Sequence, residues 1–197
     1  MRNPQRTKQI IIEHSANLFN TRGYKATSLS DITTATGFTK GAIYKHFKNK
    51  EDLEQHALRS LSKQMFDILN SKIKTAENFQ SKIEVVFIFF ENYFENPPYE
   101  GGCPLMNSAC ESDDLDAGLR QQSFGMLVTF KTTIERIFNS ALKKGTLKKD
   151  TDIDLLTHLF IATLEGAIMM SKLERNNLAL KKCISYLRTI VAGITVK

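Results

Sequence analysis

The chain has 197 residues, of which 42% are hydrophobic and 24% are charged. This length and composition are typical of a globular protein with one or two domains and a sizeable buried core. The net charge of +6 is unevenly placed, because residues 1–64 carry 11 Lys and Arg against 5 Asp and Glu, whereas residues 65–197 carry 16 of each. A basic module joined to a neutral body is the charge pattern of a DNA-binding protein.

Other protein classes fit the sequence poorly. Three cysteines, an odd number without regular spacing, do not suggest the disulfide framework of a secreted domain. We expect neither a signal peptide nor a membrane span, because the beginning of the chain is polar and its most apolar run, 83–90, is too short. The four histidines form no metal-ligand spacing with the cysteines, and no catalytic or phosphate-binding motif appears. We therefore expect a cytoplasmic protein that is not an enzyme and holds no metal and no cofactor.

Three short helices are predicted within the basic module. Apolar residues at helical spacing place the first over 6–20. Ser28, followed three residues later by an acidic residue, opens the second as a near capping box, and Gly37 ends it. Thr39 caps a third helix over about 40–47. Two helices joined by a short turn with a glycine form a helix-turn-helix, whose second helix enters the major groove of DNA.

The pattern stays helical beyond this module, with four prolines and no convincing strand-type alternation. A helix that begins at residue 50 continues past the basic module and links it to the second part of the chain. The next helix carries aromatic residues on more than one face, which places it at the centre of a second domain. Residues 96–102 form the clearest loop. The later helices are expected over 76–95, 104–110, 113–144, 152–173 and 178–194.

Individual residues of the basic module also carry a family signature. In chain order these residues are Phe19, Gly23, Tyr24, Thr27, Ser28, Asp31, Ile32, Ala35, Gly37, Lys40, Gly41, Tyr44, His46, Phe47, Lys50 and Glu51. With this spacing, residues 6–58 resemble the DNA-binding domain of TetR-family repressors. The resemblance implies an all-α protein with a three-helix DNA-binding domain over 4–64. A larger helical domain for ligand binding and dimerisation would follow over 65–197.

The recognition helix over 40–47 supplies most of the residues expected to face DNA. Thr39 and Lys40 lie at its positive N-terminal end, which suits contact with a phosphate or a base. Gly41 allows the backbone to approach DNA closely, and Lys45 and His46 project from the same helix. His46 is equally well explained as a surface residue without a role in reading bases.

Three further DNA contacts are implied by the resemblance alone. In TetR-family proteins the residues at the positions of Thr27, Tyr44 and Lys50 typically contact phosphates. Tyr44 has an alternative interpretation as an aromatic residue of the core.

The protein is expected to bind a double-stranded, palindromic operator as a homodimer. Helix-turn-helix proteins usually dock two recognition helices in successive half-sites, since one short helix gives little affinity alone. Broad apolar faces on the last two helices fit a four-helix dimer interface, as the resemblance also implies. The alternative is that both faces are internal core.

The resemblance further implies that a small molecule releases the protein from its operator. Met and aromatic residues at helical spacing are candidates for the effector pocket, although an ordinary core has the same pattern. Their abundance suggests an apolar or aromatic ligand. These candidates are Phe87, Phe90, Phe94, Met126, Phe130, Phe160 and Met169.

Cys103 is a separate candidate for effector sensing. It precedes Pro104 at a helix N-terminus, where the pKa of a thiol falls and the reactive thiolate forms more readily. The segment resembles a TetR subgroup in which some members sense electrophiles or oxidants through cysteine. The alternative is a small buried residue that packs the loop. We therefore expect a regulator, most simply a repressor released by an apolar or electrophilic effector. The rival hypothesis is a thiol-based sensor or binding protein acting through Cys103, with DNA binding secondary.

Overall fold

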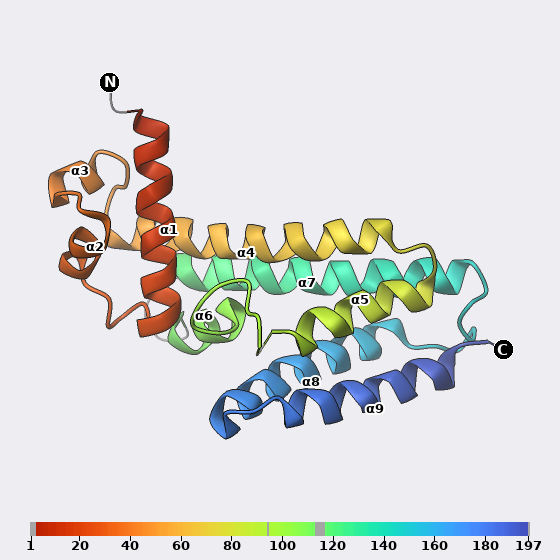
Figure 1. The fold of residues 1–197 in the computed structure, drawn as a ribbon. Coiled ribbons are helices and arrows are strands. Elements are labelled where there is room, and N and C mark those ends of the chain that lie inside the picture. Colours follow the sequence, from red (N-terminus) through yellow and green to blue (C-terminus); the bar gives the residue numbers. More distant parts are fainter. Residues whose placement is uncertain (1–2, 94, 113–116, 197) are drawn as a thin grey trace. The chain divides into compact units, whose positions relative to one another are not determined.

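A computed structural model describes residues 3–93, 95–112 and 117–196, and these are almost entirely helical. The prediction of an all-α fold is confirmed. Within the described residues, the one β-type pairing is an isolated bridge between Leu147 and Thr195. The helices, labelled in Figure 1, are α1 (Pro4–Arg22), α2 (Leu29–Thr36), α3 (Lys40–Tyr44), α4 (Lys50–Thr75), α5 (Phe79–Glu91), α6 (Pro104–Ser112), α7 (Ala117–Lys143), α8 (Ile153–Glu174) and α9 (Leu178–Ile194).

Several helices differ at their ends from the sequence-based predictions: α1 and α6 are longer than expected, whereas α3 and α5 are shorter. The recognition helix α3 ends at Tyr44 rather than near residue 47, because the chain then turns, with the His46 N–H bonded to the Ile43 carbonyl. Helix α5 begins later than predicted because Asn78 caps it reciprocally with Ser81, and it ends at Glu91. The predicted start of the long helix at 113 lies outside the described residues.

The chain divides into two compact units. The first unit spans 1–65 and 99–127, and the second spans 66–98 and 128–197. Helices α4 and α7 each begin in the first unit and end in the second. The described residues of 99–127 therefore belong to the same unit as the helix-turn-helix, although α5 lies between them in sequence. The proposed domain bounds of 4–64 and 65–197 stay a prediction.

The core of the first unit is built from the apolar faces of α1 to α4. Ile11, Ile32 and Ile43 are fully buried, as their helical spacing indicated. Phe19 stacks on Tyr24, with ring centroids 5.2 Å apart. Burying such side chains is the main source of stability for a three-helix module of this size.

The second unit is organised around stacked aromatic rings. Phe87 stacks on Phe160 and Phe90 stacks on Phe130, with centroids 5.7 and 5.6 Å apart. Helices α8 and α9 pack along each other (Figure 1), and α5 packs on α9. Arg188 of α9 binds two carboxylates of α5, with Nη1 2.7 Å from Glu91 and Nε 3.1 Å from Glu84. These hydrogen bonds raise the pKa of Arg188 above its ordinary value.

Helix α8 corrects the expectation that no segment approaches a membrane span. By length and composition alone it meets the criterion for crossing a membrane, as no other helix in the described part of the chain does. A core helix passes the same test, and 39% of the apolar window is buried in the unit. Phe160, Leu164 and Ile168 form the inward face, whereas Leu155 and Leu159 point outward. Helix α8 is thus apolar on two faces, of which only one is covered here.

Candidate DNA-binding surface and effector region

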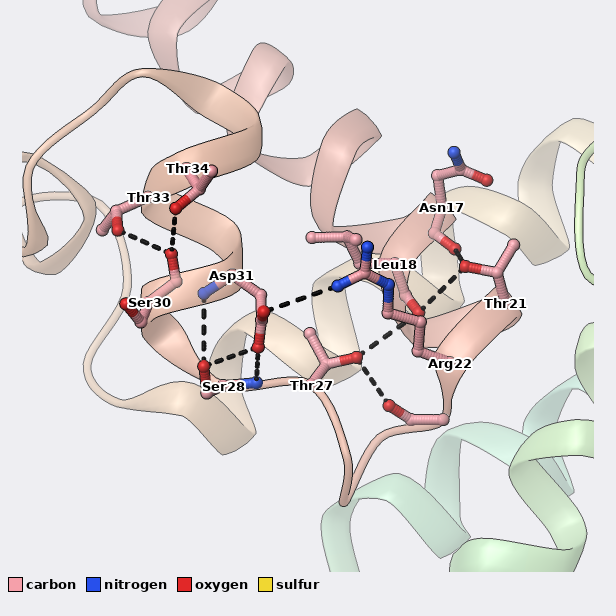
Figure 2. A network of polar contacts seen from close by, with 11 residues as sticks. Asn17, Leu18, Thr21, Arg22, Thr27, Ser28, Ser30, Asp31, Thr33 and Thr34 are labelled. Carbon is pink, nitrogen blue, oxygen red and sulfur yellow. Dashed lines mark hydrogen bonds and ion pairs between the residues drawn. The ribbon is translucent and has the colours of Figure 1, made fainter.

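The start of α2 is held by a complete capping box, shown in Figure 2. The N–H and hydroxyl of Ser28 donate to Oδ2 of Asp31 at 2.8 and 2.6 Å, and the Asp31 N–H donates to the Ser28 hydroxyl at 3.2 Å. Hydrogen bonding from Ser28 lowers the pKa of the Asp31 carboxyl below its ordinary value. Nη1 of Arg22, at the end of α1, lies 3.4 Å from the same carboxylate. The box therefore also ties α2 to α1.

Thr27 closes the turn between these two helices. Its hydroxyl donates to the Gly23 carbonyl at 2.7 Å (Figure 2). Its N–H donates to the same oxygen at 3.2 Å. The residue has no exposed surface. In this conformation Thr27 fixes the turn and presents no group to DNA, so the phosphate contact implied for it stays a prediction.

Helix α3 presents most of its predicted DNA-facing residues to solvent. The Thr39 hydroxyl accepts from the Ala42 N–H at 3.2 Å and so caps the helix, as expected. Lys40, Gly41 and Lys45 are exposed. A Cβ added at Gly41 would meet nothing within 4 Å, which leaves its outer side open to a close partner.

The side chains at the end of α3 differ in how far they reach into solvent. Tyr44 is 46% exposed, which disfavours its interpretation as a core aromatic. His46 is half-buried, with its ring edge-on to Phe47 at 6.4 Å. The buried Ile43, which directly precedes Tyr44, anchors the helix on the core.

Lys50 points into the first unit rather than into solvent. Its ammonium donates to the Tyr24 carbonyl at 2.6 Å and lies 3.1 Å from Oε1 of Glu54. It also lies 5.9 Å from the centre of the Phe19 ring, within range of a cation–π interaction. Lys50 therefore joins α4 to the end of α1, and its phosphate contact stays a prediction. Sequence analysis missed Glu54, although its i, i+4 spacing from Lys50 was a signal for this pair.

Two family profiles match this arrangement. The profile of the tetR family of bacterial regulatory proteins matches residues 11–57. The profile of the tetracyclin repressor-like C-terminal domain matches residues 80–187, which is more than half of the chain. The chain belongs to the TetR family.

Solved and curated TetR-family proteins agree with this assignment. A TetR transcriptional regulator from Chloroflexus aurantiacus has a TM-score of 0.93 and 32% identity, covering 99% of this chain and 98% of that one. A TetR-family regulator from Cytophaga hutchinsonii has a TM-score of 0.91 and 30% identity, covering 100% and 98%. The repressor DhaR from Mycobacterium sp. strain GP1 is 25% identical over 169 residues, which are 86% of this chain and 84% of DhaR. This TetR-family protein is a DNA-binding transcriptional regulator and not an enzyme.

The candidate effector residues of this TetR-family protein fall into separate groups. Phe87, Phe90, Phe130 and Phe160 belong to the stacked cluster of the second unit, where each is buried. Met169 is 47% exposed on the outer face of α8.

The remaining effector candidates lie elsewhere. Met126 and Cys103 are buried in the first unit, and Phe94 lies outside the described residues. The structure thus brings four of the eight candidates into the second unit as two stacked pairs, Phe87 with Phe160 and Phe90 with Phe130.

Proposed function

We propose that this TetR-family regulator represses transcription by binding a palindromic operator as a homodimer, and that a small effector releases it. Support comes chiefly from the helix-turn-helix, where Lys40 and Tyr44 of α3, and Lys45 directly after it, are exposed, while a buried isoleucine anchors the helix. Two copies of this short helix give the affinity that one lacks. A cytoplasmic location follows from this function and belongs to the same proposal.

The outer face of α8 is the proposed dimer surface. Leu155, Leu159, Met169 and Leu173 follow helical spacing and are all exposed. Contiguous exposed apolar patches commonly mark protein–protein interfaces, and a two-fold dimer brings the same patch of both copies together. Gly166, on the same helix, allows a close approach of the partner helix. Met169 accordingly fits the dimer better than the effector pocket.

The aromatic cluster is the proposed effector region. Phe87, Phe90, Phe130 and Phe160 come from three helices, α5, α7 and α8. An apolar or aromatic ligand could be bound only by separating rings that now touch, which would change the spacing of those helices. Release from DNA requires that the ligand prefer the state in which two recognition helices no longer match the operator.

The thiol-sensor alternative receives less support from the surroundings of Cys103. A reactive cysteine is partly exposed, whereas Cys103 is 1% exposed and Cys110 is the exposed cysteine of α6. Cys103 thus fits the packing role. Maleimide labelling of the native protein, followed by mass spectrometry, distinguishes the two. Cys110 should be labelled without denaturant and Cys103 should not; rapid labelling of native Cys103 would favour the sensor.

DNA binding is tested by a gel shift against the DNA that flanks the coding region. A discrete complex that resists competitor DNA is expected. If the protein contacts about six to ten phosphates, raising the salt from about 50 to about 200 mM should lower its affinity for DNA about 10³- to 10⁵-fold. Tyr44→Ala and Lys40→Ala should weaken the complex, whereas Lys149→Ala, an exposed lysine in the second unit, should not. Equal binding by all three variants would refute the assignment of the DNA-facing surface.

A further inference from the structure

Two asparagines join the end of α1 to the segment around α6. The buried Asn20 donates from Nδ2 to the carbonyls of Glu100 and Gly102. Asn107 of α6 reaches back, with its Nδ2 3.0 Å from the Asn20 carbonyl, 3.1 Å from Asn20 Oδ1 and 3.0 Å from the Gly101 carbonyl. All of these groups belong to the first unit. The end of α1 is thus held by side chains and carbonyls that are 80 to 87 residues away in sequence.

The close approach at this point depends on glycine. Gly101 has a φ of +90°, and a Cβ added to it would lie 2.2 Å from the Asn20 carbonyl oxygen. Such a contact is impossible without a backbone shift, so only glycine fits here. The backbone before α6 therefore lies directly against the backbone of α1.

A second set of contacts holds the turn between α1 and α2. Oε2 of Glu111 accepts from the Lys25 N–H at 3.0 Å. Gly23, with a φ of +98°, lies so close that an added Cβ would be 2.9 Å from Glu111 Oε1. The Gly23 carbonyl is the group that receives both bonds from Thr27. Glu111 thus contacts the turn that leads directly into the capping box of α2.

Residues 99–127, which include both sets of contacts, continue at each end into helices that carry the aromatic cluster. Chain continuity joins residue 99 to α5, which carries Phe87 and Phe90, and joins residue 127 to the part of α7 that carries Phe130. A change in the spacing of α5 and α7 therefore acts on both ends of the segment.

We propose that residues 99–111 form a coupling clamp, in which Asn107 and Glu111 are positioning residues that hold the α1–α2 turn to α6. A displacement of α6 then moves the turn, and with it α2 and the recognition helix. The clamp deepens the effector-controlled DNA binding proposed above and rests on it. It names the groups through which a change in the second unit reaches the DNA-facing residues.

The first test uses the Lys25 amide proton, since Glu111 is its acceptor. In Glu111→Ala, exchange at Lys25 should be about tenfold faster than in the parent protein, the effect of losing one hydrogen bond. Glu111→Gln keeps an acceptor oxygen and should remain close to the parent. Asn17→Ala is the matched control, because Asn17 bonds the same segment through an exposed side-chain contact with Glu100. Unchanged exchange at Lys25 in Glu111→Ala would overturn the proposed contact between Glu111 and the α1–α2 turn.

The second test is a double-mutant cycle, which measures whether a change in the aromatic cluster reaches the α1–α2 turn through the clamp. Phe130→Leu perturbs the aromatic cluster and should change exchange of the amides from Gly23 to Ser28 about threefold, after correction for global opening measured at Ala57. In a Glu111→Ala background the same substitution should leave those amides nearly unchanged. Asn107→Ala serves as a second background, so that an unfolded variant does not end the test.

Two outcomes overturn the coupling clamp. One is an equal effect of Phe130→Leu with and without Glu111, and the other is no effect on the α1–α2 turn in the parent background. The exchange readout needs no DNA, so its failure is distinguishable from a failure to bind an operator. A protein with an intact clamp that bound no operator would refute the proposed function and leave the coupling in place.

Discussion

Replacing Lys50 by alanine tests whether this residue serves the fold or the DNA contact. The substitution removes the hydrogen bond to the Tyr24 carbonyl and takes the ammonium away from the nearly enclosed Glu54 carboxylate. TetR-family resemblance alone predicts loss of DNA affinity with an intact fold. The structure predicts a loss of stability as well.

The expected magnitude follows from the two interactions. A hydrogen bond from a charged donor contributes about 1.5–3 kcal/mol, and breaking a buried ion pair on one side costs about 3–5 kcal/mol. These terms overlap, and the Lys50 side chain is 25% exposed, so water will replace part of the loss. We therefore expect Lys50→Ala to lower the free energy of unfolding by about 2–4 kcal/mol, which many domains survive.

The assay is urea unfolding followed by circular dichroism at one fixed protein concentration, since dimerisation shifts the transition. Lys48→Ala, an exposed lysine two residues away, should change the free energy of unfolding by less than about 0.5 kcal/mol. In the double variant Lys50→Ala/Glu54→Ala, about 1–2 kcal/mol of the loss should be recovered, because no carboxylate is left without its cation. A stability of Lys50→Ala equal to that of Lys48→Ala, together with weaker DNA binding, would refute the structural role and support the phosphate contact.

Three further predictions follow from single contacts. Tyr24→Phe should be neutral or stabilising by up to about 1 kcal/mol in urea unfolding, because the buried Tyr24 hydroxyl has no hydrogen-bond partner among the described residues; a loss above that size would reveal a partner. Leu159→Glu should convert the dimer to monomer in analytical ultracentrifugation at micromolar concentration, since it places a charge in the proposed apolar interface; an unchanged dimer would place the interface elsewhere. Because the native pKa of Asp31 is lowered, its carboxylate stabilises the fold above the ordinary Asp pKa, and this contribution is lost as the pH falls through the native pKa. The stability difference between the parent protein and Asp31→Asn should therefore shrink steadily in acid, and a constant difference would contradict the assignment.

Local features of the sequence predicted much of the fold. The capping box at Ser28, the glycine that ends α2 and the cap at Thr39 were all identified correctly, because each depends on residues within a few positions of one another. Helical periodicity likewise located the helices, with errors mainly at their ends. The family signature extended this to the DNA-binding function, since its residues carry the helix-turn-helix itself.

The direction in which a side chain points was less predictable. Sequence analysis placed Thr27 and Lys50 on the DNA-facing surface, yet both bind backbone carbonyls inside the first unit. Aromatic spacing singled out Phe87 and Phe130, which are both buried in the second unit, but the same set of candidates included Met169, which points outward. Periodicity identifies an apolar residue without stating which of two packed faces it occupies.

Interactions between near neighbours in the chain specify the helices, their caps and the basic helix-turn-helix, so these features are readable from the sequence. The packing of residues 99–112 against α1 is not, because it joins Asn20 to the Gly102 carbonyl, 82 positions away in the chain. No local pattern encodes such a contact, since its groups are brought together by the packing of entire helices. Gly101 is required by this contact, because an added Cβ would collide with the Asn20 carbonyl oxygen. The sequence shows the glycine but not the carbonyl that makes it necessary.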